Sequence, residues 1–406
     1  MSYTFKPNIS KEEFKQFTQS QPILNFMQEY EWAFVKSEWK HFHCGLYKEN
    51  NLVATALVLK RTLPLGISFM YVPRGFLVDY ENLEDLQQLT TELKKLAKQE
   101  GSYMIKIDPN FCYKEYGIET IEKGIDVDVP IAYSKNYESK HNNLLQCGFK
   151  FKGYTKSIEE TIQPRYNMYI PLIDSNFNML DEAQAKAKFK KRIRSYLGSY
   201  HEKRGIYYFH SNDKKYLDLF MEVINNTEKR QNIHLRNREY FENMLDQFQD
   251  EAMLFIGMID LEKYLEFIKP KNNQEEISTI EALLKQGRKD VPLSASFVLL
   301  PKNDGIRTSE YLYAGNDLSF AKLNASVGLV YDICKYSIQN GIHYCNLGGI
   351  NGTFDDHLTP FKSRFNPVVF EFAGEYDLPT QPIRYHLIEF FMPILKNVYA
   401  WFRSKK

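Results

Sequence analysis

The chain has 406 residues, a formal net charge of +1 and an aromatic content of 15%. This length indicates two or three domains or two packed repeats, and the balanced charge argues against a histone-like or bulk nucleic-acid coat protein. Five scattered cysteines without a Cys-x-x-Cys pair exclude a disulfide framework and a zinc site and fit a reducing cytoplasm. The N-terminus lacks the apolar core of a signal peptide, and no apolar run reaches the ~18 residues of a membrane span.

The first half of the chain predicts an α/β domain. Ser10 and Glu13 form a capping box that starts a helix, and Leu24–Lys40 indicates a second helix. Alternating residues over His41–Lys60 predict a hairpin with its turn at 48–51. The remaining predicted elements are a strand at Ser68–Val72, a helix at about Asn82–Gln99, a strand at Tyr103–Ile107, a helix near Tyr137–Cys147 and a strand at Phe149–Tyr154.

The second half repeats this plan. Its predicted elements are strands at Ala252–Ile259, Leu293–Leu300 and Glu310–Ala314, a helix at about Phe320–Asn340 and a strand at His343–Leu347. Strand–helix–strand thus occurs twice, which predicts two α/β domains of one architecture. Asp108 and Gly348 then fall at equivalent strand ends, where α/β sheets commonly bind ligands.

A charged insertion, Asp260–Asp290, interrupts the second domain. Helical patterns at Leu261–Ile268 and Glu275–Lys285 flank a break at 270–273, so the insertion predicts a short projecting helical hairpin. A disordered surface insertion is the alternative.

The segment Ile342–Pro367 contains the pair Gly348-Gly349 and then Phe361-Lys362. A strand that ends in paired glycines exposes backbone to which a ligand can come close. Lys362, just beyond the loop, is then a candidate charge stabiliser. A simple turn followed by a solvated lysine is the alternative.

The run Lys186–Arg204 holds eight Lys or Arg residues and a single acidic one, and its apolar residues recur at helical spacing. One face can therefore pack while the other presents a basic stripe, which suits phosphate backbones. A merely solvated face is the alternative. The candidate phosphate contacts are Lys190, Lys191, Arg192 and Arg194.

Three further places in the sequence carry polar side chains that could bind a ligand or take part in catalysis. Arg236 and Tyr240 have the i, i+4 spacing of one helix face, and an arginine can clamp a phosphate, although an ordinary surface cluster has the same pattern. Trp32 and Lys36 share that spacing, so the lysine either holds a diphosphate or extends past an apolar face. Asp108 lies at the end of a buried strand. Its carboxylate could act as a general base, or it could form an Asx turn before the proline.

Common catalytic motifs are absent from the sequence. It contains no P-loop, no dinucleotide fingerprint after a strand, no His-Glu-x-x-His and no Gly-x-Ser-x-Gly. The histidines also lack metal-ligand spacing. Nucleotide hydrolysis, dinucleotide redox chemistry and zinc catalysis are therefore unsupported, and we expect no metal.

Together these residues resemble the Fem peptidyltransferases, the group of FemA, FemX and MurM, over essentially the whole chain. The MurM and FemX members, which add the first residue of the interpeptide bridge to lipid II, are the most similar. The motifs that carry the resemblance are Trp32…Lys36, Tyr71–Gly75, Ile107–Pro109, Thr161–Arg165, Arg230 through Arg236 to Phe241, Tyr311–Gly315, Asn346-Leu347-Gly349, Phe361-Lys362…Phe365–Pro367 and Gly374-Glu375.

The resemblance implies an α/β (α+β) fold with two acetyltransferase-like (GNAT) domains. The first would cover 1–158 and be completed by 374–406, and the second would cover 159–373. The insertion at 260–290 sits where the family carries a helical arm, although it is shorter than the arm of FemA.

The resemblance also implies a function. The family transfers an amino acid from aminoacyl-tRNA to the stem-peptide lysine of lipid II or of the soluble UDP-linked precursor, without another cofactor. Lys362 with Phe361 would meet the reacting ester, and Asp108 matches a position once proposed as the base. The residues that would bind the acceptor are Lys36, Arg236, Tyr240, Tyr103, Tyr313 and Trp32.

These residue types fit ester aminolysis, because a positive charge can stabilise the tetrahedral oxyanion. The alternatives are a CoA-dependent N-acyltransferase, whose usual pyrophosphate loop is not found, and a non-catalytic protein that binds cell-wall precursor or tRNA. The apolar segment Tyr385–Lys406 predicts either contact with the inner face of the cell membrane or a core-packed terminal helix.

Overall fold

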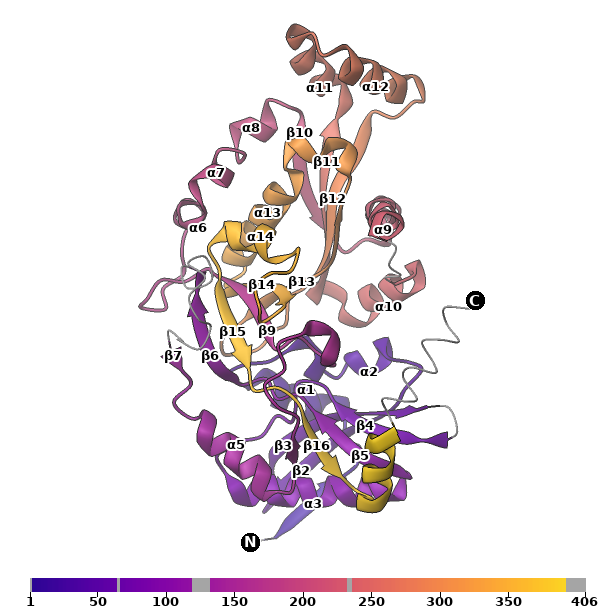
Figure 1. Cartoon of the computed structure of the whole chain (residues 1–406), viewed down its shortest axis with the longest axis vertical. Helices are drawn as coiled ribbons and strands as arrows, with labels where there is room; N and C mark the ends of the chain where they lie inside the picture. The colour runs from indigo at the N-terminus through magenta and orange to yellow at the C-terminus, as the bar shows by residue number, and fades with distance from the viewer. Residues whose placement is uncertain (1, 64–65, 119–131, 232–235, 392–406) are drawn as a thin grey trace. The chain divides into compact units, whose positions relative to one another are not determined.

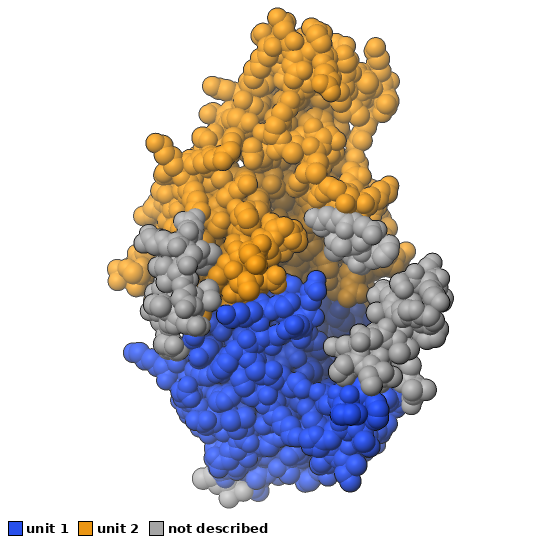
Figure 2. Space-filling view, viewed as in Figure 1, with its two compact units in different colours: residues 1–115, 130–165, 371–406 blue, residues 116–129, 166–370 orange. Residues whose placement is uncertain are grey.

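The computed structural model describes residues 2–63, 66–118, 132–231 and 236–391 (Figure 1). The chain forms two compact units (Figure 2). The first contains Met1–Glu115, Pro130–Arg165 and Glu371–Lys406, and the second contains Tyr116–Val129 and Tyr166–Phe370. The sequence placed the main boundaries at 158/159 and 373/374, whereas the structure has them at 165/166 and 370/371. The first unit therefore combines the two ends of the chain.

The first unit is built on a seven-stranded sheet with the order β1-β2-β3-β4-β5-β16-β8. Strands β4 and β5 are parallel, and the other neighbours are antiparallel. The apolar face of α3 fills the core over this sheet with buried leucines. The elements are β1 (Tyr3–Lys6), α1 (Lys11–Gln19), α2 (Trp32–Val35), β2 (Lys40–Lys48), β3 (Asn51–Thr62), β4 (Ser68–Val72), α3 (Leu83–Gln99), β5 (Ser102–Ile107), α5 (Tyr137–Gln146), β8 (Lys150–Phe151) and β16 (Tyr376–Pro379), with a helical segment at 382–391.

The second unit repeats this strand plan with the order β10-β11-β12-β13-β14-β9-β15. Here β13 and β14 are the parallel pair, at the positions that β4 and β5 hold in the first sheet. The predicted duplication is therefore confirmed. Its elements are β9 (Tyr166–Pro171), β10 (Ile206–Ser211), α9 (Leu217–Gln231), α10 (Arg238–Phe248), β11 (Ala252–Asp260), β12 (Asp290–Leu299), β13 (Thr308–Asn316), α13 (Ala325–Gln339), β14 (Tyr344–Ile350), α14 (Thr359–Lys362) and β15 (Val368–Phe372).

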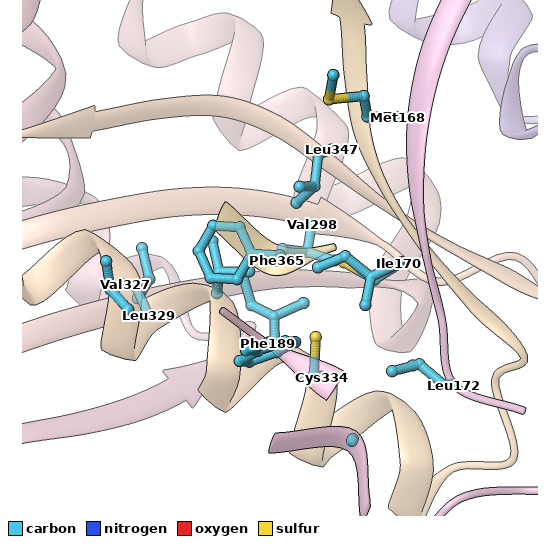
Figure 3. Close-up of a cluster of buried hydrophobic side chains, with 14 of the residues drawn as sticks. Met168, Ile170, Leu172, Phe189, Val298, Val327, Leu329, Cys334, Leu347 and Phe365 are labelled. Atoms are coloured by element: carbon cyan, nitrogen blue, oxygen red, sulfur yellow. The ribbon is translucent and has the colours of Figure 1, made fainter. Parts of the chain in front are cut away.

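A single apolar core holds the parts of the second unit that carry the site (Figure 3). Leu347 of β14 and Phe365, at the end of the 3-10 turn that follows α14, are both buried in it, and Phe189 packs edge-on against Phe365 with ring centroids 5.2 Å apart. The strand with the paired glycines and the helix with Lys362 are therefore anchored to the same core.

Two predicted helices are wrong in extent. The stretch Leu24–Lys40 forms only a 3-10 turn at Phe26–Gln28 and the one-turn helix α2, because the backbone leaves the helical region at Lys36 (φ −93°, ψ 44°). The basic run forms three short helices: α6 (Glu182–Lys188), α7 (Lys191–Arg194) and α8 (Ser199–Glu202). Extended backbone at Phe189 and Lys190 and a positive φ of 70° at Gly198 separate them.

The predicted helical hairpin is confirmed as α11 (Leu261–Ile268) and α12 (Gln274–Lys285). Its ends meet where Asp260 pairs with Asp290 across β11 and β12. Tyr264 and Ile280 are buried in a small core with Phe320, so the hairpin packs onto its own unit. Within the described part of the chain, no helix combines the length and apolar character needed to cross a membrane.

Candidate functional site

Lys362 ends the short helix α14 and points its side chain inward. Only 6% of the residue is exposed, and its Nζ donates a 2.8 Å hydrogen bond to the carbonyl oxygen of Gly349. A lysine ammonium has three donors, and Gly349 is its one hydrogen-bond partner among the residues that the structure describes. A buried cation with unused donors is suited to an anionic oxygen of a ligand.

A bulge in β14 brings the Gly349 carbonyl to this ammonium. The pairing of β14 with β9 shifts between Asn346 and Gly349, and Gly348 has a φ of +81°, which glycine adopts without steric cost. The Asn346 side chain fixes the bulge: its Oδ1 accepts from the Gly348 N–H at 2.8 Å, and its Nδ2 donates to Glu310 at 2.8 Å and to the Tyr169 hydroxyl at 3.2 Å.

Asp356 fixes the start of the Lys362 helix. Its carboxylate accepts hydrogen bonds from the backbone N–H groups of Asn351, Leu358 and Thr359 and from the Thr359 hydroxyl. Although burial opposes them, these hydrogen bonds hold the pKa of Asp356 below its ordinary value. Asn346 and Asp356 were not predicted as site residues, although Asp356 followed by Thr359 has the spacing of a helix-capping pair.

Burial lowers the pKa of Lys362 to about 8, while the charge of Asp356 acts in the opposite direction. The ammonium form still predominates at pH 7. Phe361 packs partly into the core, with its ring 5.4 Å from that of Phe365, and this contact holds the turn of α14 in place. The arrangement can therefore present a positive charge at a fixed position.

A tyrosine pair forms a second polar feature of this unit. The hydroxyls of Tyr240 and Tyr313 share a 3.0 Å hydrogen bond, and the Arg236 guanidinium lies 4.9 Å from the Tyr240 ring centroid. Tyr313 lies in a bulge of β13 and has a φ of +39°, which is strained for a residue with a side chain. The structure thus brings Arg236, Tyr240 and Tyr313 together.

Asp108 lies buried at the end of β5 in the first unit. Its Oδ1 accepts hydrogen bonds from the Tyr71 hydroxyl and the Arg74 N–H, both at 2.9 Å, and the Arg74 guanidinium is 3.6 Å from Oδ2. Burial raises the pKa of Asp108 to about 6, although the Arg74 charge and the hydrogen bonds oppose the shift. The carboxylate holds the turn that contains Arg74, whose φ is +57°.

The other predicted residues of the first unit differ in accessibility. Lys36 Nζ lies 4.8 Å from the centroid of the Trp32 ring, so this pair is formed. Tyr103 is only 1% exposed and packs against Tyr385 with ring centroids 6.3 Å apart. The prediction that Tyr103 lines a binding cleft is therefore corrected: the aromatic residue occupies the core of its unit.

The basic residues lie on and around α7. Lys191 and Arg192 are exposed, and Lys190 precedes the helix with extended backbone. Arg194 donates a 3.3 Å hydrogen bond to the carbonyl of Ala187 and thereby helps to hold the turn between α6 and α7. The structure places these side chains around a one-turn helix, whereas the sequence had predicted them along a continuous stripe.

The chain is similar in sequence and in structure to known proteins. Curated relatives include the lipid II:glycine glycyltransferase of Staphylococcus aureus (strain USA300), which is 24% identical over 434 residues and matches over 96% of both chains. The crystal structure of FemX has a TM-score of 0.77 at 24% identity and covers 96% of this chain and 100% of its own.

A tandem GNAT protein from the clavulanic acid biosynthesis pathway has a TM-score of 0.51 at 8% identity, covering 93% of this chain and 99% of its own. These similarities, with the repeated strand order, show a fold of two acetyltransferase-like domains. The model of the FemAB family matches residues 9–276 and 268–392. Because that match covers most of the chain, the protein belongs to the FemAB family.

Proposed function

We propose that this protein is an aminoacyltransferase that moves an amino acid from aminoacyl-tRNA to the stem-peptide lysine of lipid II, in the synthesis of a peptidoglycan interpeptide bridge. The relatives that match 96% of the chain are named for glycyl transfer to lipid II. The observation that carries the proposal within this chain is the buried Lys362 ammonium, held by Gly349 and with donors left for a ligand.

The proposed reaction is the aminolysis of an ester. The lysine amine of the acceptor attacks the carbonyl carbon, a C–N bond forms, and the carbonyl oxygen becomes an oxyanion. Collapse of this intermediate breaks the C–O bond to the ribose, and the proton that the amine loses balances the one that the ribose oxygen gains. Lys362 stabilises the oxyanion, a contribution of about 3 kcal/mol for one well-placed donor.

Acceptor binding is assigned to two groups of polar residues, each described within its own unit. In the first unit Lys36 stands beside Trp32, where its charge suits a phosphate. In the second unit Arg236 supplies a bidentate donor set and the Tyr240–Tyr313 pair supplies hydroxyls. Asp108 is assigned a positioning role, because its Oδ1 is already occupied by Tyr71 and Arg74.

Membrane contact is assigned to the helical segment 382–391. Ile383, Leu387 and Phe390 are 81%, 55% and 73% exposed, and their i, i+4, i+7 spacing places them on one face. Lipid II is membrane-anchored, so an apolar stripe of this kind suits its enzyme, working at the cytoplasmic side where charged tRNA is found. The rest of the predicted segment, 392–406, lies outside the described residues.

A donor-by-acceptor transfer matrix tests the function. Glycyl-, alanyl- and seryl-tRNA would be offered singly, each with lipid II and with the UDP-linked precursor, and the modified acceptor would be detected by mass spectrometry. We expect transfer with at least one charged tRNA. Transfer from acetyl-CoA instead would assign a CoA-dependent N-acyltransferase, and no transfer from any donor would leave a binding protein.

A further inference from the structure

Glu310 of β13 and Asn346 of β14 form a buried side-chain pair next to the bulge that receives Lys362. They are 5% and 4% exposed, and Asn346 Nδ2 donates a 2.8 Å hydrogen bond to Glu310 Oε2. Burying a carboxylate costs free energy, which hydrogen bonds must offset. The place of this carboxylate, beside the strand that supplies the Gly349 carbonyl, indicates what it does there.

The pair marks the point at which two parallel strands separate. The ladder between β13 and β14 ends with Glu310 opposite Asn346, although both strands continue beyond this pair. In the first unit the corresponding strands, β4 and β5, stay paired to their last residues, Val72 and Ile107. The fork therefore belongs to the unit that contains Lys362, and the Glu310–Asn346 hydrogen bond lies directly before the bulge.

The surroundings of the Asn346 amide favour a single orientation. Its Nδ2 donates to Glu310 and to the Tyr169 hydroxyl, and its Oδ1 accepts from the Gly348 N–H. Turning the amide over would place Oδ1 against the carboxylate, as two acceptors, and Nδ2 against the Gly348 N–H, as two donors. Because a carboxylate only accepts, Glu310 keeps Nδ2 on its own side and Oδ1 directed at Gly348.

The bulge transmits this orientation to the Lys362 ammonium. The hydrogen bond from the Gly348 N–H fixes the peptide that enters Gly348, whose φ is +81°. The carbonyl of the next residue, Gly349, then accepts the 2.8 Å hydrogen bond from Lys362 Nζ. A displacement of about 1 Å can lower the rate of a catalysed step about 100-fold, so a change at Glu310 can reach turnover through this chain.

We propose that Glu310 is a positioning residue for Lys362: it fixes the Asn346 amide, the amide fixes the bulge at Gly348, and the bulge places the Gly349 carbonyl that holds the ammonium. The contribution of Glu310 to aminoacyl transfer rests on the proposed function. The hydrogen-bond chain itself can be tested without transfer, because the Gly348 N–H is one of its members.

Two substitutions of Glu310 separate its acceptor from its charge and size. Glu310→Met keeps the length and removes the acceptor, so the Gly348 N–H should exchange with solvent about tenfold faster, and kcat should fall about tenfold or more at an unchanged Michaelis constant for lipid II. Glu310→Gln removes the charge and keeps an acceptor oxygen, so both quantities should stay within about threefold of the parent. Amide exchange followed by NMR on the full chain and steady-state transfer rates measure them.

A polarity exchange tests whether Glu310 acts through Asn346. Asn346→Asp places two carboxylates at the 2.8 Å contact, so it should speed Gly348 exchange and lower kcat as Glu310→Met does. Adding Glu310→Gln restores a donor opposite an acceptor, because the glutamine amide donates to the new carboxylate. The double variant should therefore recover most of both losses, which a side chain that only fills space would not produce.

The matched control is Ser309→Ala, at the neighbouring position of β13. Ser309 is fully buried and accepts a 3.0 Å hydrogen bond from the Ser337 hydroxyl of α13. Successive side chains of a strand point to opposite faces, so this hydrogen bond lies on the other face from the Asn346 contact. The control should lose stability and keep the parental Gly348 exchange and kcat. Melting temperatures would establish that each variant is folded.

Three results would overturn the assignment. The first is an equal loss in Glu310→Met and Glu310→Gln, which would assign the effect to the charge. The second is no recovery in the double variant, and the third is a loss in Ser309→Ala as large as in Glu310→Met. If the parent transfers nothing, Gly348 exchange alone decides: its recovery in the double variant would retain the hydrogen-bond chain and reject the proposed function.

Discussion

Lys362 carries a positive charge into the interior of the second unit, a placement that opposes stability and that suits the proposed stabilisation of an oxyanion. Its hydrogen bond to the Gly349 carbonyl does not replace the hydration that a lysine has at the surface. The two effects can be measured separately.

Replacing Lys362 by methionine should lower kcat about 100- to 1,000-fold, because the oxyanion loses its main donor. The Michaelis constant for lipid II should change little, since acceptor binding is assigned to other residues. Steady-state transfer rates measure both quantities. Lys302→Met, at an exposed site, serves as the control, and equal kcat in Lys362→Met and the parent would remove Lys362 from the mechanism.

The same substitution should stabilise the fold. The folded-state pKa of Lys362 is about 8, below the 10.5 of the unfolded chain, so the buried charge destabilises the parent by up to about 3 kcal/mol below pH 8. As the pH rises from 8 to 10.5, the free energy of unfolding of the parent increases by this amount. The difference in stability between the variant and the parent should therefore become smaller. Denaturant unfolding at pH 7 and pH 10 measures the difference. A variant less stable than the parent at both values would mean that the ammonium supports the fold.

At the scale of elements, the bulge of β14 determines where Lys362 can make its hydrogen bond. Gly348→Ala would place a methyl group 3.7 Å from Nζ, at a residue with φ of +81°. The backbone strain should cost about 1–2 kcal/mol. The methyl group also occupies space next to the ammonium, so we expect kcat to fall at least tenfold.

Gly341→Ala separates these two effects. Gly341 also has a positive φ, +65°, but a methyl group there would meet no atom within 4 Å. It should lose similar stability and keep the parental kcat. If both variants lost activity in proportion to stability, the bulge would have no specific role beside Lys362.

The helical segment 382–391 makes a separate prediction. Ile383→Ser/Leu387→Ser should weaken binding to vesicles of anionic phospholipid in a flotation assay, because two of the three apolar side chains of the stripe are removed. Leu318→Ser, at an exposed site of the second unit, is the control. Undiminished flotation of the double variant would assign the stripe to another partner.

Sequence patterns predicted the elements well where the signal is local. The hairpin of β2 and β3 turns at Glu49 and Asn50, both with positive φ, as the polar tetrapeptide indicated. The amphipathic spacing around Trp32 predicted too long a helix, because this spacing does not report that the backbone leaves the helical region at Lys36. Helical spacing in the basic run concealed the break at Gly198.

The candidate site was only partly predictable, because sequence patterns report local relations and not contacts between distant residues. Lys362 and the paired glycines are near each other in the sequence, so their association could be inferred. The hydrogen bond between Tyr240 and Tyr313 joins residues 73 positions apart, and only the fold brings them together. The burial of Tyr103 depends on a residue from the far end of the chain, Tyr385, and no local pattern reports it.

At the scale of the whole molecule, the two sheets have the same strand order but carry different side chains at corresponding strand ends. At the end of β5, a buried carboxylate, Asp108, holds a turn through Tyr71 and Arg74. On β14, at the corresponding place, a bulge receives a lysine. One copy of the repeat thus has a structural strand end, and the other has the candidate reactive group.

A chain that stops after Phe370 should contain a folded second unit and an unfolded first unit. It lacks β16, which lies between β5 and β8 in the first sheet, whereas every residue of the second unit is present. Limited proteolysis should then leave a resistant fragment from the second unit and digest residues 1–115. Protection of both regions would show that β16 is dispensable.

The position of β16 also sets an order of events during translation. The second unit is complete once residue 370 has left the ribosome, but the first sheet must wait for residues 376–379. Until then β5 offers an unpaired edge to other nascent chains, which is a hazard for aggregation. The part of the protein that is synthesised first is therefore the last to be finished, and any premature stop yields a chain whose N-terminal half remains a substrate for chaperones and proteases.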